Sequence, residues 1–233
     1  MASILGANIV NFQVPDRALR SSSDRCQRCQ DTGWERVIQG LHSSVRRCTA
    51  RLHLRETLIS ANVPELYADS TIDDFAVPSG TIGLLERIKQ FCSAYPKVND
   101  GFFLTGGPNT GKTHLAVAVM FELLARGARR VKFHDTTELL RRLDPGSGVL
   151  DIRSRKELLA ETQSAGLIVL DDFGAVTPTD SEIEQLDYLI DSHYRAMRPM
   201  IITSRRTSDD LSSIFGTRII SRMVSMATEI DLG

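Results

Sequence analysis

Residues 106–113 have the types and spacing that hold the phosphate groups of a nucleotide. They read GGPNTGKT, which fits the pattern G-x-x-x-x-G-K-[ST]. The glycines let the backbone turn so that its N–H groups face an anion, and the helix that follows directs its positive end at the same place. Lys112 is expected to reach the β- and γ-phosphates, and Thr113 to offer a hydroxyl to Mg²⁺. The residues predicted to bind the nucleotide are Gly106, Gly107, Pro108, Asn109, Thr110, Gly111, Lys112, Thr113 and His114.

Two adjacent carboxylates supply the acidic partner that such a loop needs. The apolar run 167–170 (LIVL) is followed at once by Asp171 and Asp172, as at the end of a buried parallel strand. We expect Asp171 to hold Mg²⁺, directly or through its water shell, and Asp172 to orient or deprotonate the attacking water. Without the phosphate-binding loop, a strand end followed by a solvated turn would explain the same residues equally well.

The surrounding pattern alternates helices and strands, which predicts a parallel sheet with helices on both faces, an α/β fold. Asp135 is a candidate N-cap for the helix that contains Leu139 and Leu140. Strands are expected at 102–104, 131–134, 167–170 and 200–203, helices at 81–95, 114–124, 151–163 and 181–195, and a loop at 144–148.

Composition places the chain among ordinary globular proteins. It has 233 residues, of which 42% are hydrophobic and 24% charged, and its net charge is −1. No apolar run is long enough to span a membrane, and the N-terminus lacks the pattern of a secretory signal, so we expect a cytoplasmic protein without a membrane partner. Residues 16–55 carry nine arginines against four acids, a balance of +5. This basic segment could meet nucleic acid or an acidic protein surface, or simply be solvated.

Three of the four cysteines fall in the same segment. Cys26 and Cys29 form a C-x-x-C pair and Cys48 follows, a spacing that indicates a structural Zn²⁺ site more than a disulfide. His42 or His53 could supply the fourth ligand, and free thiols remain the alternative. The predicted organisation is a basic Cys-bearing module at 1–57, a connector at 58–80, and an ATPase domain at 81–233.

Several segments, in this order, resemble the bacterial helicase loaders of the DnaC/DnaI type within the AAA+ superfamily, and their relatives, the IstB transposition ATPases. The resemblance runs from about Cys26 to the C-terminus. Its segments are CQRCQDTGW from Cys26, VPELY from Val63, TIDDF from Thr71, the phosphate-binding loop, LIVLDDFG, YRAMRPMIITS from Tyr194, and RIISRM from Arg218.

The resemblance also implies roles that the residues alone leave open. Thr203 and Ser204 correspond to the sensor-1 strand end, which monitors the γ-phosphate, but Arg205 stands where the family usually has Asn. Arg222 matches the arginine finger that reaches the ATP of a neighbouring subunit, and Arg218 is the alternative.

The function implied by the resemblance is that of an ATP-dependent loader of a replicative helicase. Its partners would be a hexameric DNA helicase, single-stranded DNA, and further copies of the chain assembled with ATP and Mg²⁺. The Cys module favours this function over an IstB-like transposition ATPase. A third alternative, suggested by Arg205, is an adaptor that binds ATP without hydrolysing it.

Overall fold

The computed structural model describes residues 57–68, 70–77 and 83–233, and the backbone of residues 34–39 and 42–47. The chain divides into two units, residues 1–52 and 53–233. In the first unit, β1 (Trp34–Gln39) and β2 (His42–Arg47) pair as an antiparallel hairpin. Cys26, Cys29, Cys48 and His53 lie outside the described residues, as do the side chains of the hairpin, so zinc binding stays a prediction.

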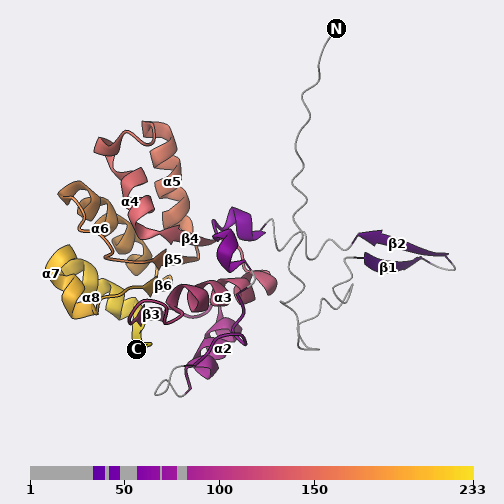
Figure 1. Ribbon diagram of the computed structural model, residues 1–233. Helices are drawn as coiled ribbons and strands as arrows, with labels where there is room; N and C mark the ends of the chain where they lie inside the picture. The colour runs from indigo at the N-terminus through magenta and orange to yellow at the C-terminus, as the bar shows by residue number, and fades with distance from the viewer. Residues whose placement is uncertain (1–33, 40–41, 48–56, 69, 78–82) are drawn as a thin grey trace, which may run out of the picture. The chain divides into compact units, whose positions relative to one another are not determined.

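The second unit is built on a five-stranded, fully parallel sheet (Figure 1). The strand order is β4-β5-β6-β3-β7, so the strand that leads into the phosphate-binding loop lies inside the sheet. The register places Asp135 opposite Asp171 and Leu104 opposite Thr203. The strands are β3 (Gly101–Thr105), β4 (Val131–Asp135), β5 (Leu167–Asp171), β6 (Met200–Thr203) and β7 (Ala227–Asp231).

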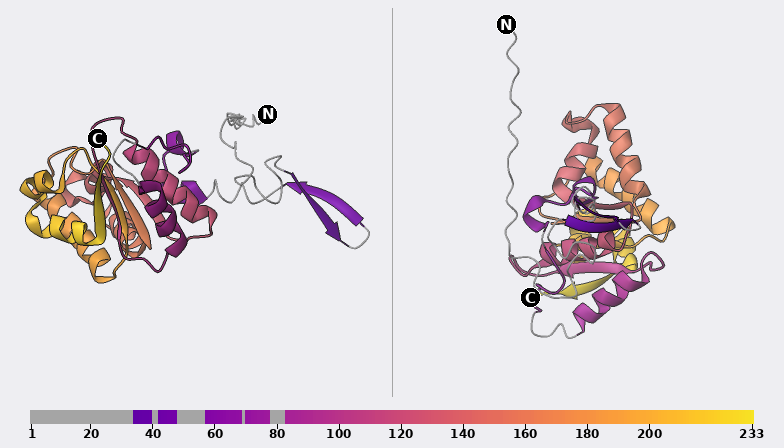
Figure 2. Two further views of the ribbon diagram at one scale, coloured as in Figure 1. Left: turned by 90° about the horizontal axis from the view of Figure 1, so that it is seen from below. Right: turned by 90° about the vertical axis from the view of Figure 1, so that its right-hand side faces the viewer.

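Helices cover both faces of this sheet, as the sequence predicted (Figure 2). One face packs against α2 and α3, and the other against α4 to α8. The helices are α2 (Leu84–Ala94), α3 (Lys112–Ala125), α4 (Thr136–Leu143), α5 (Ile152–Ser164), α6 (Asp180–Arg195), α7 (Ser208–Phe215) and α8 (Thr217–Met226), with short 3₁₀ turns at Glu65–Tyr67 and Pro145–Ser147. In the part of the chain that the structure describes, no helix combines the length and apolarity needed to cross a bilayer.

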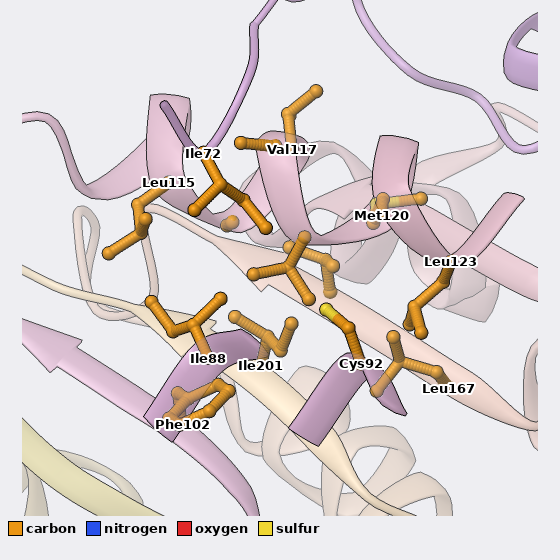
Figure 3. Packing of buried hydrophobic residues seen from close by; sticks show 14 of the residues in the cluster. Ile72, Ile88, Cys92, Phe102, Leu115, Val117, Met120, Leu123, Leu167 and Ile201 are labelled. Carbon is orange, nitrogen blue, oxygen red and sulfur yellow. The ribbon is translucent and has the colours of Figure 1, made fainter. Parts of the chain in front are cut away.

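The buried side chains form two hydrophobic cores, one on each face of the sheet, because successive residues of a strand point to opposite faces. On β6, Ile201 packs into the α2–α3 core, whereas Met200 and Ile202 face the other side. Successive strand side chains point to opposite faces, so an uninterrupted apolar run is required where both faces are buried. Figure 3 shows the α2–α3 core, in which Ile88 and Cys92 of α2 lie against the sheet beneath Leu115 and Met120 of α3.

Residues before α2 belong to the same core. Leu58, Ala61, Ile72 and Phe75 are buried in the α2–α3 cluster. Backbone bonds reinforce this packing, since the Phe133 N–H donates to the Ala61 carbonyl at 2.7 Å. The described part of the segment expected to be a connector therefore packs against the domain that contains the parallel sheet.

Two buried histidines meet at Thr162 of α5. The Thr162 hydroxyl donates to the Leu158 carbonyl, so it accepts from His134 Nε2 at 3.3 Å. His193 Nε2 lies 3.0 Å from the Thr162 carbonyl and donates to it. Burial, as the largest cause, lowers the pKa of both histidines from 6.5 to about 4. Both imidazoles are therefore neutral in the folded protein at pH 7.

This neutral pair predicts acid-sensitive stability. Because the folded-state pKa is lowered, the stability is fully present above pH 6.5 and falls between pH 6.5 and 4, where only the unfolded chain takes up the protons. The loss reaches about 3 kcal/mol per histidine. Urea unfolding at pH 7.5 and pH 5 measures it. The His134→Gln/His193→Gln variant is expected to show a shallower pH dependence, and identical slopes for variant and wild type would contradict the argument.

Candidate nucleotide-binding site

The phosphate-binding loop connects the carboxyl end of β3 to the first residue of α3. Gly111 has φ of 86°, a conformation that favours glycine, and a Cβ there would lie 2.7 Å from the Phe75 ring. Asn109 also has a positive φ of 62°. The loop is further held by the Gly107 N–H, which donates to the Gly233 carbonyl at 2.7 Å. Contacts from outside the loop thus help to set its backbone conformation.

Lys112 is a buried ammonium surrounded by neutral oxygens. Its side chain belongs to a residue only 8% exposed and donates to the carbonyls of Gly106 at 2.9 Å and Gly107 at 2.5 Å, and to the Thr110 hydroxyl at 3.1 Å. No carboxylate among the described residues forms an ion pair with it. Burial, followed by the charge of Arg205, lowers the pKa of the ammonium. A buried cation without an acidic partner fits an anionic ligand such as a triphosphate.

Asp171 is fixed by hydroxyls from two other elements. Its Oδ1 accepts from Thr113 of α3 at 2.8 Å and from Thr203 of β6 at 2.6 Å. Burial raises the pKa of this carboxyl, and the two hydroxyl bonds oppose that rise. The two residues predicted to hold Mg²⁺, Thr113 and Asp171, therefore lie in direct contact, which fits a cation site of hard oxygen ligands.

Asp172 has a different environment from its neighbour. Its backbone lies at φ of 51°, and its N–H donates to the Thr203 hydroxyl at 2.9 Å. Its carboxylate is more open and forms an ion pair with Arg205 Nε at 3.4 Å. The arginine at the sensor-1 position therefore partners the predicted catalytic carboxylate. Ser204 instead donates to the Phe173 carbonyl at 2.7 Å and is fully buried, so its contacts support the turn after β5.

Comparison of the sequence with known protein families gives a match over most of the chain. The sequence profile of the family described as IstB-like ATP binding protein aligns with residues 21–226. The chain belongs to the IstB-like ATP-binding family.

Proteins similar to this IstB-like chain include some named as replicative helicase loaders and one named for an insertion sequence. The replicative helicase loader DnaC of Escherichia coli K12 is 22% identical over 194 residues, or 82% of this chain and 78% of that protein. An insertion-sequence ATP-binding protein of Sinorhizobium fredii is 32% identical over 134 residues, 55% of this chain and 43% of that protein. The crystal structure of a DnaC helicase loader superimposes with a TM-score of 0.64 at 26% identity, covering 73% of this chain and all of that one.

Arg222 of the IstB-like chain is held by two carboxylates of α6. Its guanidinium contacts Asp187 at 2.9 Å and Asp191 at 2.8 Å, and its side chain is 19% exposed. Arg218 reaches the same Asp187 at 3.3 Å but is 68% exposed. The structure therefore separates the two finger candidates: Arg222 is anchored within the subunit, and Arg218 is the more accessible.

His114 lies beside the loop and links it to the segment before α2. Its Nε2 is 3.1 Å from the Thr71 carbonyl, and its ring centroid is 6.2 Å from that of Phe75. This places His114 at the edge of the predicted nucleotide site, where it supports the wall that contains Phe75.

Sequence reasoning missed several members of this site. The role of Thr203 came only from the resemblance, and the partners Thr136, Asp187 and Asp191 were not predicted. The Thr136 hydroxyl donates to the Asp171 carbonyl at 2.8 Å. Asp187 and Asp191 stand four residues apart, one helical turn, so their shared face was available from the sequence. Nothing in the sequence said which basic side chain would meet that face.

Thr203 gives the sharpest test of the site. Thr203→Val preserves the shape but leaves the Asp172 N–H and one Asp171 oxygen without this partner. We expect ATP affinity in the presence of Mg²⁺ to fall about tenfold, because a hydrogen bond to a charged group contributes about 1.5 kcal/mol or more. Isothermal titration calorimetry measures this affinity.

Thr136→Val is the matched control. It removes a buried hydroxyl of the same size that contacts only the backbone of Asp171. We expect near wild-type affinity for this variant. Equal losses in both variants would contradict a specific role for the Thr203 hydroxyl at the carboxylate.

Proposed function

We propose that this protein is an ATP-dependent loader of a replicative DNA helicase onto single-stranded DNA. The observation that carries this proposal is the extent of the similarity: the alignment with DnaC spans 82% of the chain, against 55% for the insertion-sequence relative. Membership of the ATP-binding family and the site around Lys112 support the nucleotide dependence.

The chemistry proposed for the site divides between the two carboxylates. Thr113 and Asp171 would hold Mg²⁺, which when bound neutralises charge on the β- and γ-phosphates. Lys112 would exchange its three loop oxygens for phosphate oxygens. Asp172 follows Asp171 directly, and its carboxylate is not bonded to the two hydroxyls that Asp171 accepts from. It would orient or deprotonate the attacking water. For that role its ion pair with Arg205 has to loosen, and the γ-phosphate is an alternative partner for the guanidinium.

Specific observations favour two other functions. The insertion-sequence relative, at 32% identity, favours a transposition ATPase that acts on duplex DNA. The Arg205–Asp172 ion pair favours an ATP-gated adaptor without turnover, since it occupies the carboxylate that would have to contact the attacking water.

An assay of helicase loading onto single-stranded DNA distinguishes these functions. Purified replicative helicase from the source organism would be offered to single-stranded DNA circles coated with single-strand-binding protein, and unwinding of an annealed primer would be measured. We expect unwinding to require this protein and ATP, and to be lost with Lys112→Ala. Absence of helicase binding and loading, with stimulation of strand transfer by a transposase, would replace the proposal with the transposition function.

Assembly in trans is the second part of the proposal, and Arg222 is the finger that we expect. Asp187 and Asp191 hold its guanidinium within the subunit, so these ion pairs have to open when it reaches the ATP of a neighbour. Subunits with Arg222→Ala should bind ATP normally but hydrolyse it at least about tenfold more slowly, since a finger contributes a large factor to turnover.

Mixing experiments test whether the arginine acts across an interface. Arg222→Ala subunits retain the nucleotide pocket, and Lys112→Ala subunits retain the finger, so their mixture should recover part of the hydrolysis rate. Arg218→Ala is the matched control on the same helix and should stay close to wild type. If Arg218→Ala is the inactive variant and Arg222→Ala is not, the finger is Arg218.

A further inference from the structure

A cavity lies at the sheet edge opposite to the nucleotide site. It encloses about 700 Å³ between the end of α2, the end of α3 and the residues that precede β4, β5 and β6. The strands are parallel, so their amino ends gather here, while the phosphate-binding loop and Asp171 lie at their carboxyl ends. Five-residue strands separate the two edges by roughly 15 Å.

Four arginines from two segments line this cavity, three between α3 and β4 and one before β6. Arg126 ends α3, Arg129 and Arg130 precede β4, and Arg198 precedes β6. The other lining residues include Tyr95, whose hydroxyl would lie 2.7 Å from a Cβ at Gly166. A glycine there keeps the wall close to the phenol, so the arginines border a defined cavity.

The charges of these arginines are largely uncompensated. Arg126 pairs with Glu122 at 2.6 Å, the one carboxylate among the described residues that contacts any of the four. Arg130 and Arg198 donate instead to the carbonyls of Ser164 and Gln163 at the end of α5. Arg129 is exposed and forms no side-chain hydrogen bond or ion pair within the described part of the chain.

We propose that this cavity is a binding site for phosphate groups, separate from the nucleotide site. Four arginines at one cavity raise its positive potential, and among the described residues no carboxylate forms an ion pair with Arg129, Arg130 or Arg198. Guanidinium groups present planar, paired donors that match phosphate oxygens. Neutral carbonyls fix Arg130 and Arg198 in place, which leaves their remaining N–H groups for a ligand. Two sources share this chemistry: the backbone of a nucleic acid strand and a small phosphate compound.

Arg129 is the residue to change, because it has no partner in the described residues whose loss would disturb the fold. Arg129→Glu would be compared with Arg87→Glu, which makes the same charge change at an exposed position of α2 outside the cavity. Both full-length variants would first be checked by thermal melting. In the absence of ATP, the affinity for a fluorescein-labelled 15-nucleotide single strand would be measured by anisotropy across a salt series.

A second arm uses inorganic pyrophosphate. Calorimetry would be done with Lys112→Ala added to each protein, so that the phosphate-binding loop contributes little. In either arm, loss of a phosphate contact should weaken binding by about tenfold for Arg129→Glu, against less than about threefold for Arg87→Glu. For the oligonucleotide, Arg129→Glu should also reduce the slope of log affinity against log salt concentration by about one.

The two arms identify the source of the phosphate. A selective loss for the oligonucleotide assigns the cavity to a nucleic acid strand, and a selective loss for pyrophosphate assigns it to a small phosphate compound. Equal behaviour of Arg129→Glu and Arg87→Glu in both arms overturns the proposal. This outcome is independent of helicase loading, which is tested by a different measurement.

Discussion

The arrangement of the site depends on one partly buried carboxylate. Asp171 sits where β5 ends, and hydroxyls from α3 and β6 converge on a single oxygen of its side chain. Removing a carboxylate from water is unfavourable, so it requires these bonds, and they in turn fix the start of α3 against the sheet. The same Thr203 hydroxyl accepts the Asp172 N–H and so sets the direction of the next residue. These hydrogen bonds thereby align the phosphate-binding loop, Asp171 and the end of β6.

The parallel sheet makes this convergence possible. All five strands end at one edge, and the loop strand β3 lies beside β6, so residues about a hundred positions apart in the sequence, such as Leu104 and Thr203, become neighbours. The opposite edge collects the segments that enter the strands, and there the chain places arginines. The parallel sheet thus has two edges of different chemistry. Carboxylates and hydroxyls gather near Lys112 at one edge, and arginines gather near Arg129 at the other.

Much of this could be predicted from the sequence. Apolar runs bounded by turn residues identified β3 to β6, and Asp135 caps α4 by accepting from the Glu138 N–H at 2.9 Å, as expected. The β1–β2 hairpin was not predicted, because Val37, Ile38 and Val45 do not alternate with polar residues. The pairing of Arg205 with Asp172 and of Arg222 with Asp187 could not be predicted either, because an arginine has many available carboxylates and only the tertiary fold selects one. Strand β7, which pairs with β3, was not predicted because its sequence, ATEID, contains few apolar residues.

The central claim is that the two adjacent carboxylates have different tasks. We propose that Asp171 holds the site together and binds the metal, whereas Asp172 acts at the chemical step. ATP binding and steady-state hydrolysis of Asp172→Asn, measured on the same preparation, test this most directly. The account predicts nearly unchanged affinity and loss of most turnover, because Asn keeps the backbone contact to Thr203 but cannot act as a base. Turnover equal to that of the wild type would contradict the account and place the base elsewhere.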